Sequence, residues 1–227
     1  MIVVALDSLR NRLEEAIARY RSKVDYLAIR LEEIQETDLL LRRGKLETLS
    51  DGISIGGQVR TCHKGGWGFA SFNDLDSLVA RIENAIASAK LVGDDETILA
   101  AVDPIHAIAH HPLTGTDPRR VALADKKALC DRYDGILRSG GDRITTTTVR
   151  YGDSAQHVIL ATSEGTWIEQ SWVDMEMRFA ATARDGKRCR RVGKRRDPVG
   201  AMKIYWGWMA RFAAQRIEPW QHYHYRR

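Results

Sequence analysis

Three histidines lie close together in the segment DPIHAIAHHPLTG. His106 and His110 are four residues apart, a spacing that would place both imidazoles on one face of a helix. A hydrolytic zinc site needs such a pair, a further ligand and a carboxylate that takes a proton from the metal-bound water. Position 107 is alanine rather than glutamate, and Pro104 and Pro112 bracket the segment. The pattern therefore favours solvent-exposed histidines over a metal site.

The other reactive patterns in the chain are weaker. Ser163-Glu164-Gly165 is typical of a turn rather than of an activated serine, because no G-x-S-x-G pattern is present. The pairs Gly56-Gly57 and Gly65-Gly66 are not followed by the Lys-Ser/Thr pair of a phosphate loop. A run of carboxylates fits a charged sheet face better than a paired acid and base: Glu32, Glu33, Glu36 and Asp38. The sequence assigns no catalytic, cofactor-binding or metal-binding residue.

The three cysteines, Cys62, Cys130 and Cys189, are odd in number and widely spaced. No C-x-x-C pair is present, which argues against a disulfide framework or a zinc ribbon. We expect free thiols.

The stretch from Asp51 to Lys90 has the clearest change of period in the chain. Apolar and polar residues alternate up to Thr61, apart from a glycine pair that suggests a bulge or a close backbone approach. Lys64-Gly65-Gly66 predicts a turn into a short strand around Trp67-Gly68-Phe69. A helix follows, with Asn73 as its N-cap and Gly93 beyond its end. Its apolar face is predicted to consist of Leu75, Leu78, Val79, Ile82, Ala85, Ile86 and Ala89.

The remaining elements follow from the same periodicities. A first helix is expected over 7–21, capped by Asp7 or Ser8, and a second one starts near Asp117-Pro118 and ends at Gly140-Gly141. The first is predicted to have an apolar face of Leu9, Leu13, Ala16, Ile17 and Tyr20, and the second one of Val121, Ala124, Ala128, Leu129, Tyr133, Ile136 and Leu137. The segment 93–118 is expected to be a long connection. Strands are predicted at 26–33, 143–151, 157–162 and 173–183, with a further hairpin at Arg43-Gly44-Lys45. Because the strands come in short-turn pairs, the fold class is α+β, with antiparallel sheets packed against helices on one side.

Positive charge is concentrated in one part of the sequence. The 227 residues carry a net charge of +5, and eight Lys/Arg with one Asp lie between Arg184 and Arg196. Such a run could meet nucleic acid, but it contains no aromatic residue that would stack on bases. Asp185-Gly186 predicts a hairpin turn with charged flanks. A solvated hairpin is favoured over a nucleic-acid surface.

The apolar residues of the chain are enough for a folded core but not for a membrane span. They make up 44% of the sequence. No run of 18 apolar residues occurs, and the N-terminal apolar stretch is too short and too soon charged for a signal peptide. We expect a cytoplasmic protein that does not cross a membrane.

The run GGQVRTCHKGGWGFASFNDLDSLVARIENAIASAK resembles the N-terminal domain of the TldD/PmbA family of zinc metallopeptidases. That family carries a G-x-x-V-R segment, a G-x-x-G-F-A-S-like segment and then an alanine-rich helix. Several glycines, Arg60 and the aromatic pair Trp67 and Phe69 match in order, and ATSEGTWIEQ resembles the family's T-S-E-G turn. The resemblance covers roughly residues 26–196 and includes no catalytic residue.

The resemblance implies a domain at 1–196 and a divergent aromatic-rich tail at 197–227. The family's zinc lies in a C-terminal domain with an H-E-x-x-x-H helix, which this chain lacks. His106 and His111 have the outer spacing of that motif without its glutamate, and His222 and His224 lie in the tail. No cofactor is therefore expected in this chain. Met202, Tyr205, Trp206, Met209 and Phe212 could share a helical face in a partner-binding or membrane-surface helix, and an altered reading frame would also explain the tail.

Three functions stay open at this point. The first is a non-catalytic domain of a metallopeptidase that takes part in the proteolysis of peptides, with its catalytic half missing or separately encoded. The second is a standalone peptide-binding or regulatory subunit, and the third is a basic nucleic-acid-associated module, which the composition disfavours. The resemblance implies a homo-oligomer, or a hetero-oligomer with a family member, and a peptide substrate bound by strand addition at exposed sheet edges. Whether the chain is itself an enzyme is left open.

Overall fold

The computed structural model describes residues 6–95, 99–113, 115–186 and 188–196. Its contacts divide the chain into two compact units. Unit 1 comprises Met1–Gln35, Gly52–Pro112 and Ala155–Val173, and unit 2 comprises Glu36–Asp51, Leu113–Ser154 and Asp174–Arg227. The predicted tail at 197–227 lies outside the described residues, so the domain boundary at 196 stays a prediction.

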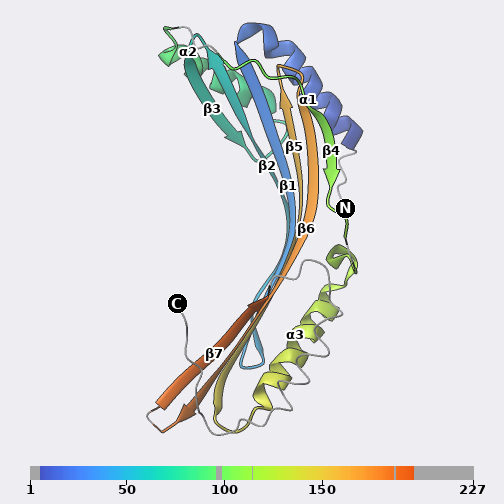
Figure 1. The fold of residues 1–227 in the computed structure, drawn as a ribbon, viewed down its shortest axis with the longest axis vertical. Coiled ribbons are helices and arrows are strands. Elements are labelled where there is room, and N and C mark those ends of the chain that lie inside the picture. Colours follow the sequence, from blue (N-terminus) through green and yellow to red (C-terminus); the bar gives the residue numbers. More distant parts are fainter. Residues whose placement is uncertain (1–5, 96–98, 114, 187, 197–227) are drawn as a thin grey trace. The chain divides into compact units, whose positions relative to one another are not determined.

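The architecture is α+β, as the sequence predicted. The strands are β1 Tyr26–Arg42, β2 Lys45–His63, β3 Gly66–Phe72, β4 His106–His110, β5 Ile144–Thr162, β6 Trp167–Asp185 and β7 Arg188–Arg196. The helices are α1 Leu6–Tyr20, α2 Leu78–Val92 and α3 Leu123–Arg138, with 3-10 turns at Arg21–Lys23 and Pro118–Arg120. The strand order is β3-β2-β1-β5-β6-β4, and β7 pairs with β6 (Figure 1). Within the described ranges, no helix is long and apolar enough to cross a membrane.

In unit 1, α1 and α2 cover one face of the sheet. A single buried cluster joins Leu9 and Leu13 of α1 and Ile82 of α2 to inward-facing residues such as Leu27 and Val59. The predicted apolar face of α1 is confirmed, because Leu9, Leu13, Ala16 and Tyr20 are buried and Ile17 packs, partly buried, against the same cluster. Both helices contribute to one cluster and therefore lie on the same side of the strands.

Two glycines of β3 let α2 approach the sheet closely. A Cβ atom on Gly66 would lie 2.2 Å from the Ala89 carbonyl oxygen, and one on Gly68 would lie 1.9 Å from the Ala85 carbonyl oxygen. Both distances are far shorter than a carbon–oxygen contact allows. Glycine at these two positions is thus required by the helix packing.

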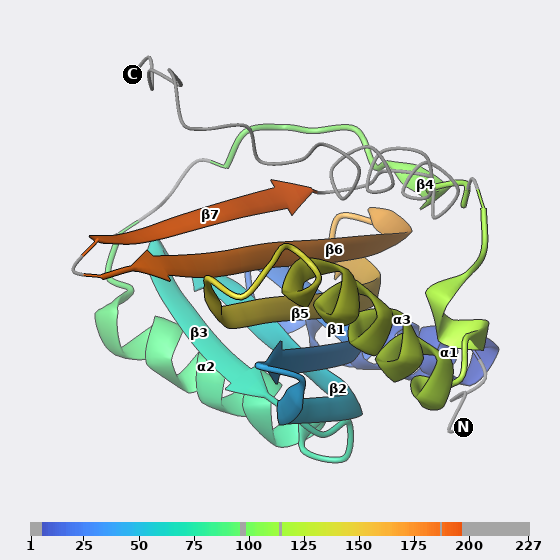
Figure 2. The same cartoon turned by 90° about the horizontal axis from the view of Figure 1, so that it is seen from below.

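In unit 2, α3 packs over β1, β5 and β6 (Figure 2). The core of this unit includes Leu39, Val149 and Phe179, with Cys130 and Tyr133 from the helix. A buried charged pair lies beside the apolar core, where Lys126 Nζ is 2.7 Å from Asp153 Oδ2. The predicted helix face included Ala124 and Ala128, which are exposed, and omitted Lys126 and Cys130, which are buried.

The helix starts differ from the prediction. α2 begins at Leu78 with Ser77 at its N-cap, so Asn73 is not the cap. Asp74 instead accepts a hydrogen bond from the Ser77 N–H at 2.8 Å, which forms a separate turn before the helix. Val79 is partly exposed rather than buried. Asp7 and Ser8 lie inside α1 rather than capping it.

The strands are longer than predicted. The two strands expected at 143–151 and 157–162 are one strand, β5. The polar residues between them suggested a break, but Asp153 is buried in the strand by its contact with Lys126. The connection expected at 93–118 contains β4, which pairs in parallel with β6 through His106 to His110. Strand β4 was missed because it is short and is held by its pairing with the distant strand β6.

The predicted hairpins are confirmed. Arg43 and Gly44 have φ values of 52° and 71°, and Lys64 and Gly65 have values of 47° and 80°. Both pairs suit a two-residue turn with positive φ at each position. In the β6–β7 hairpin Asp185 pairs with Arg188, so the turn begins at Gly186 rather than at Asp185. The described side chains of β7 are exposed, as a solvated hairpin requires, and association with nucleic acid stays untested.

Candidate functional site

Four side chains of unit 1 gather on the sheet face opposite α1 and α2. Successive residues of a strand point to opposite faces. Leu27 and Val59 belong to the helix-side core, so the adjacent Tyr26 and Arg60 point away from the helices. On β3 the Gly66 and Gly68 positions face α2, so the residues next to them in sequence point the other way. We call Tyr26, Arg60, Trp67 and Phe69 the aromatic face.

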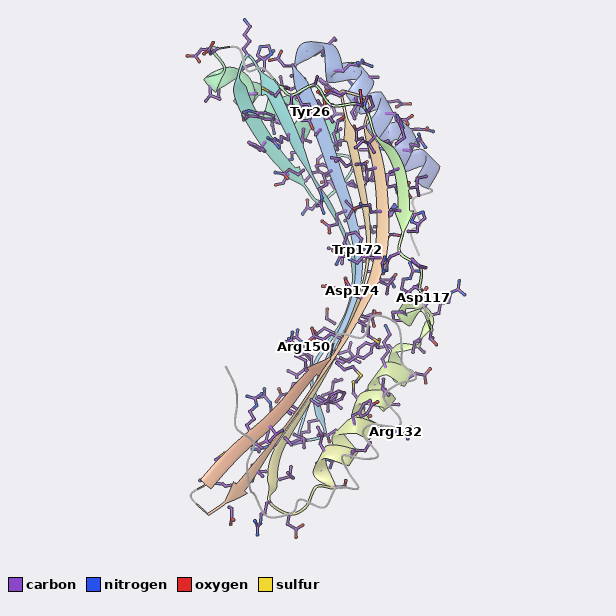
Figure 3. The ribbon with its side chains drawn as sticks, viewed as in Figure 1. Tyr26, Asp117, Arg132, Arg150, Trp172 and Asp174 are labelled. Atoms are coloured by element: carbon purple, nitrogen blue, oxygen red, sulfur yellow. The ribbon has the colours of Figure 1, made fainter. Side chains whose placement is uncertain are left out.

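The aromatic face is held together by cation–ring and ring–ring contacts. The Arg60 guanidinium carbon lies 4.1 Å from the centre of the Trp67 ring and 5.7 Å from that of Phe69. The Tyr26 ring meets Trp67 edge to face, with 6.0 Å between centroids; Tyr26 is labelled in Figure 3. Phe69 is 53% exposed. An exposed cation over a ring is worth about 0.5–1 kcal/mol, so these contacts favour this arrangement of the side chains only modestly, and Phe69 stays accessible to a ligand.

The aromatic face borders a free strand edge. β3 is the outermost strand of the sheet on this side, and it pairs with β2 through Gly57–His63 (Figure 1). Among the described strands, none pairs with the outer side of β3. Unpaired N–H and C=O groups on such an edge can pair with an added strand. Every second side chain of that strand would then lie beside Trp67 and Phe69.

The electrostatics of the aromatic face combine one cation with one nearby carboxylate. Burial is the main effect that raises the pKa of Tyr26; the Glu164 carboxylate adds to it, and the Arg60 guanidinium opposes it. Glu164 is placed by its neighbour, since the Leu27 N–H donates to Ser163 Oγ at 2.9 Å and the Ser163 N–H donates to the Leu27 carbonyl at 2.7 Å. The prediction of a turn at Ser163-Glu164-Gly165 is confirmed.

His106, His110 and His111 are exposed, as the sequence favoured. His106 and His110 are on strand β4, where four residues span about 13 Å. Zinc–nitrogen bonds are about 2 Å long, so the two imidazoles do not fit one metal ion. His110 Nδ1 lies 2.7 Å from Ser171 Oγ. In the part of the chain that the structure describes, no group of three His, Cys, Asp or Glu could hold a metal.

Among the other residues discussed from the sequence, two carboxylates form ion pairs and the cysteines are free thiols. Glu32 Oε2 is 2.7 Å from Arg30, and Asp38 Oδ2 is 2.6 Å from Arg150, which is labelled in Figure 3. These ion pairs fit the predicted charged sheet face. Cys62, Cys130 and Cys189 are free, as expected. His222 and His224 lie outside the described residues.

The stacking of Arg60 on Trp67 was not predicted from the sequence. The sequence did, however, contain the turn that places Arg60 near the residues of the next strand. A two-residue turn at Lys64-Gly65 fixes the hairpin register and brings Arg60 opposite Phe69. The sequence could not show that Tyr26 belongs to the same group, because its strand is distant from the other three residues in the chain.

Two family models match this chain. PmbA/TldA metallopeptidase domain 1 matches residues 27–89, and the PmbA/TldA metallopeptidase central domain matches residues 116–218. The chain belongs to the TldD/PmbA family. The resemblance seen in the glycine and Arg60 motifs is thereby confirmed.

Curated relatives carry metalloprotease names. Metalloprotease slr0863 of Synechocystis is 59% identical over 200 residues, which are 88% of this chain and 42% of that protein. A metalloprotease of Methanothermobacter thermautotrophicus is 28% identical over 170 residues, 72% of this chain and 35% of that protein. The chain thus spans about two fifths of the length of the relatives it matches.

Solved structures share the fold. A Thermotoga maritima protein described as a candidate modulator of a DNA gyrase has a TM-score of 0.68 at 16% identity, over 86% of this chain and 44% of that one. TldE from Thermococcus kodakarensis has a TM-score of 0.65 at 16% identity, over 90% of this chain and 47% of that one. At this identity the likeness establishes the fold.

Proposed function

We propose that this chain is the polypeptide-binding, non-catalytic part of a TldD/PmbA metallopeptidase and takes part in the proteolysis of peptides. The observation that carries the proposal is the exposed Phe69 and the Arg60–Trp67 stack beside the free edge of β3. The metalloprotease names of the relatives support the reaction class. A cytoplasmic location stays a prediction.

Backbone pairing supplies the affinity in this proposal. An extended peptide pairs with the outer edge of β3, and its apolar side chains rest on Trp67 and Phe69. Main-chain hydrogen bonds need no particular sequence, while the rings favour aromatic or aliphatic residues at every second position. Arg60 favours a neighbouring carboxylate. The site therefore accepts unfolded segments of varied sequence.

Peptide-bond hydrolysis would then depend on residues outside this chain. We expect the chain to act in a homo-oligomer or in a hetero-oligomer with a family member. A calorimetric zinc titration of the EDTA-treated chain tests this division, and we expect no uptake. Stoichiometric uptake that disappears in the His106→Ala/His111→Ala variant would contradict it. A standalone regulatory subunit is the alternative if the chain binds peptide but associates with no family member.

Binding by strand addition is tested by removing the backbone N–H hydrogen-bond donors of the peptide. The probe is a capped ten-residue peptide of serine, alanine and phenylalanine, titrated into the full chain by calorimetry. The matched control is the same peptide with every backbone nitrogen methylated, which keeps the side chains but removes the N–H donors. We expect measurable binding of the first and none of the second. Equal binding of both peptides would exclude pairing at a strand edge.

A further inference from the structure

An apolar groove lies in unit 2, along one side of α3. Its volume is about 270 Å³, and its walls come from the 3-10 turn before the helix, from α3 itself and from β5. Asp125 and Arg132 line part of it, and the other walls are mostly apolar: Pro118, Val121, Ala128, Leu129 and Tyr151. Ala128 is exposed, so the groove is open to solvent. We call it the α3 groove.

The α3 groove is on the side of the helix that faces β6. Asp134 marks the opposite side, because it accepts a hydrogen bond from Thr147 Oγ1 and lies beside Gly44, in the turn between β1 and β2. At 3.6 residues per turn, helical positions two or five apart point in roughly opposite directions. Leu129 and Arg132 therefore point away from β1 and toward β6.

Strand β7 brings the chain to this same side of α3. β6 lies between β5 and β7 (Figure 2), and neighbouring strands are about 4.8 Å apart, so β7 runs about 10 Å from β5. The backbone of Arg196, at the end of β7, pairs with Met177. Met177 shares a buried cluster with Tyr151, whose side chain lines the groove. The segment that follows β7 thus starts close to the α3 groove.

That segment carries side chains that such a groove accepts. Residues 197–227 contain Trp206, Trp208 and Trp220, which are three of the six tryptophans in the chain. An apolar cavity of about 150 Å³ holds a benzene molecule, so the α3 groove has room for the two fused rings of an indole. Ten residues span up to about 33 Å, which is ample for Trp206 to reach the groove from Arg196. We propose that the segment Trp206-Gly207-Trp208 docks an indole ring in the α3 groove.

The borders of the α3 groove suit this occupant. Asp125 is an exposed carboxylate on α3, and Lys203 precedes Trp206 by three positions, so docking brings opposite charges together. Arg132, labelled in Figure 3, lines the groove, and a guanidinium over an indole is attractive. Gly207 has no side chain that would hold the backbone away from the helix. Ring size, charge and reach therefore favour the same segment.

This inference does not depend on peptide binding at β3. The α3 groove and the aromatic face belong to different compact units. Peptide affinity and occupancy of the groove are measured separately, so one proposal can fail while the other holds. The occupant put forward here is a segment of the same chain, and a second copy or a separate ligand is the competing outcome.

Methyl NMR of the full chain tests occupancy of the groove. An aromatic ring shifts the resonances of methyl groups beside it, so the Ala128 and Leu129 methyl groups report an indole in the groove. We expect Trp206→Leu/Trp208→Leu to move both resonances. The matched control is Trp220→Leu, which is more than twice as far from Arg196 along the chain and should leave them in place. Unchanged resonances in the double variant, or equal changes in both proteins, would overturn the proposal.

Disulfide trapping provides a second test. Ala128→Cys/Gly207→Cys is made in a Cys189→Ser background, because Cys62 and Cys130 are buried. The control is Lys127→Cys/Gly207→Cys, since Lys127 pairs with Asp131 on the other side of α3. Under mild oxidation we expect the disulfide within one chain to form at least about tenfold faster with the cysteine at position 128. Equal rates would contradict docking, and a disulfide between two chains would assign the groove to a second copy and contradict the proposal.

Discussion

The two units use a positive charge in opposite ways. In unit 1, Arg60 lies on the surface, 4.1 Å from the centre of Trp67 and beside the free edge of β3. In unit 2, Lys126 is almost completely buried, 2.7 Å from Asp153 and 2.9 Å from Thr37 Oγ1. The first cation is available to a ligand, and the second joins a helix to the strands beneath it. Burial therefore separates the proposed recognition residue, Arg60, from the structural residue, Lys126, although both side chains are cations.

The energetic reason lies in desolvation. A buried ion pair repays the loss of water only while both partners remain, so removal of one leaves an uncompensated charge. An exposed cation keeps much of its hydration and loses little when its partner changes. We expect variants of unit 2 to alter stability and variants of the aromatic face to alter binding.

The largest expected effect comes from breaking the buried pair. Lys126→Met leaves Asp153 buried without its cation, and we expect the free energy of unfolding to fall by about 3–5 kcal/mol. Urea denaturation followed by circular dichroism measures the change. The control is Lys127→Met, because the Lys127–Asp131 pair is about half exposed. That variant should change stability by under about 1 kcal/mol, and an equal loss in both variants would refute the contrast.

The next effect tests the glycine contact that supports the aromatic face. Gly68→Ala places a methyl group against the α2 backbone, 1.9 Å from the Ala85 carbonyl oxygen, and should destabilise the chain by about 1–3 kcal/mol. Gly135→Ala in α3 is the matched control, since a Cβ there meets nothing within 4 Å. That change should stabilise the helix by about 0.5–1 kcal/mol. Thermal unfolding measures both, and a neutral Gly68→Ala would show that α2 does not pack this closely.

The buried thiols of Cys62 and Cys130 and the exposed thiol of Cys189 should differ in reactivity, and the buried ones should make stability depend on pH. Burial raises the pKa of Cys130 from 9.0 to about 12, and burial also raises that of Cys62. Because the folded-state pKa of Cys130 exceeds its unfolded value, the stabilisation from its neutral thiol is complete below about pH 9 and decreases as the pH rises toward 12. The contribution of Cys62 changes in the same direction. Cys189 is exposed. At pH 8 we expect a disulfide reagent to label one thiol per native chain and three after denaturation, and fast labelling of three native thiols would contradict the burial.

Local patterns were sufficient to predict most elements of this fold. The turn residues Arg43-Gly44 and Lys64-Gly65 located two hairpins, and the spacing of Leu9, Leu13 and Tyr20 located the buried face of α1. These signals work because turn geometry and helix periodicity depend on neighbours in sequence. The same logic failed for β4, which exists only through its pairing with β6.

Long-range contacts explain the remaining differences. Asp153 suggested a loop because nothing in the sequence shows that Lys126 lies 2.7 Å from it. The His106–His110 spacing was compatible with a helix until the pairing of β4 with β6 placed both on a strand. The resemblance identified Arg60 and Phe69 as family residues, and the structure added that they share an exposed face with Tyr26. The sequence thus identified individual residues of the candidate site but not their arrangement in space.

The most direct test of the central claim is a calorimetric peptide titration of aromatic-face variants. The serine–alanine–phenylalanine peptide is titrated into the wild type, into Arg60→Ala/Phe69→Ala and into Leu91→Ala. Leu91 is an 86% exposed residue of α2 outside the aromatic face. We predict at least about tenfold weaker binding for the double variant, with unfolding free energy within about 1 kcal/mol of wild type, and unchanged binding for Leu91→Ala. Equal affinity in all three proteins would contradict a peptide site on this face.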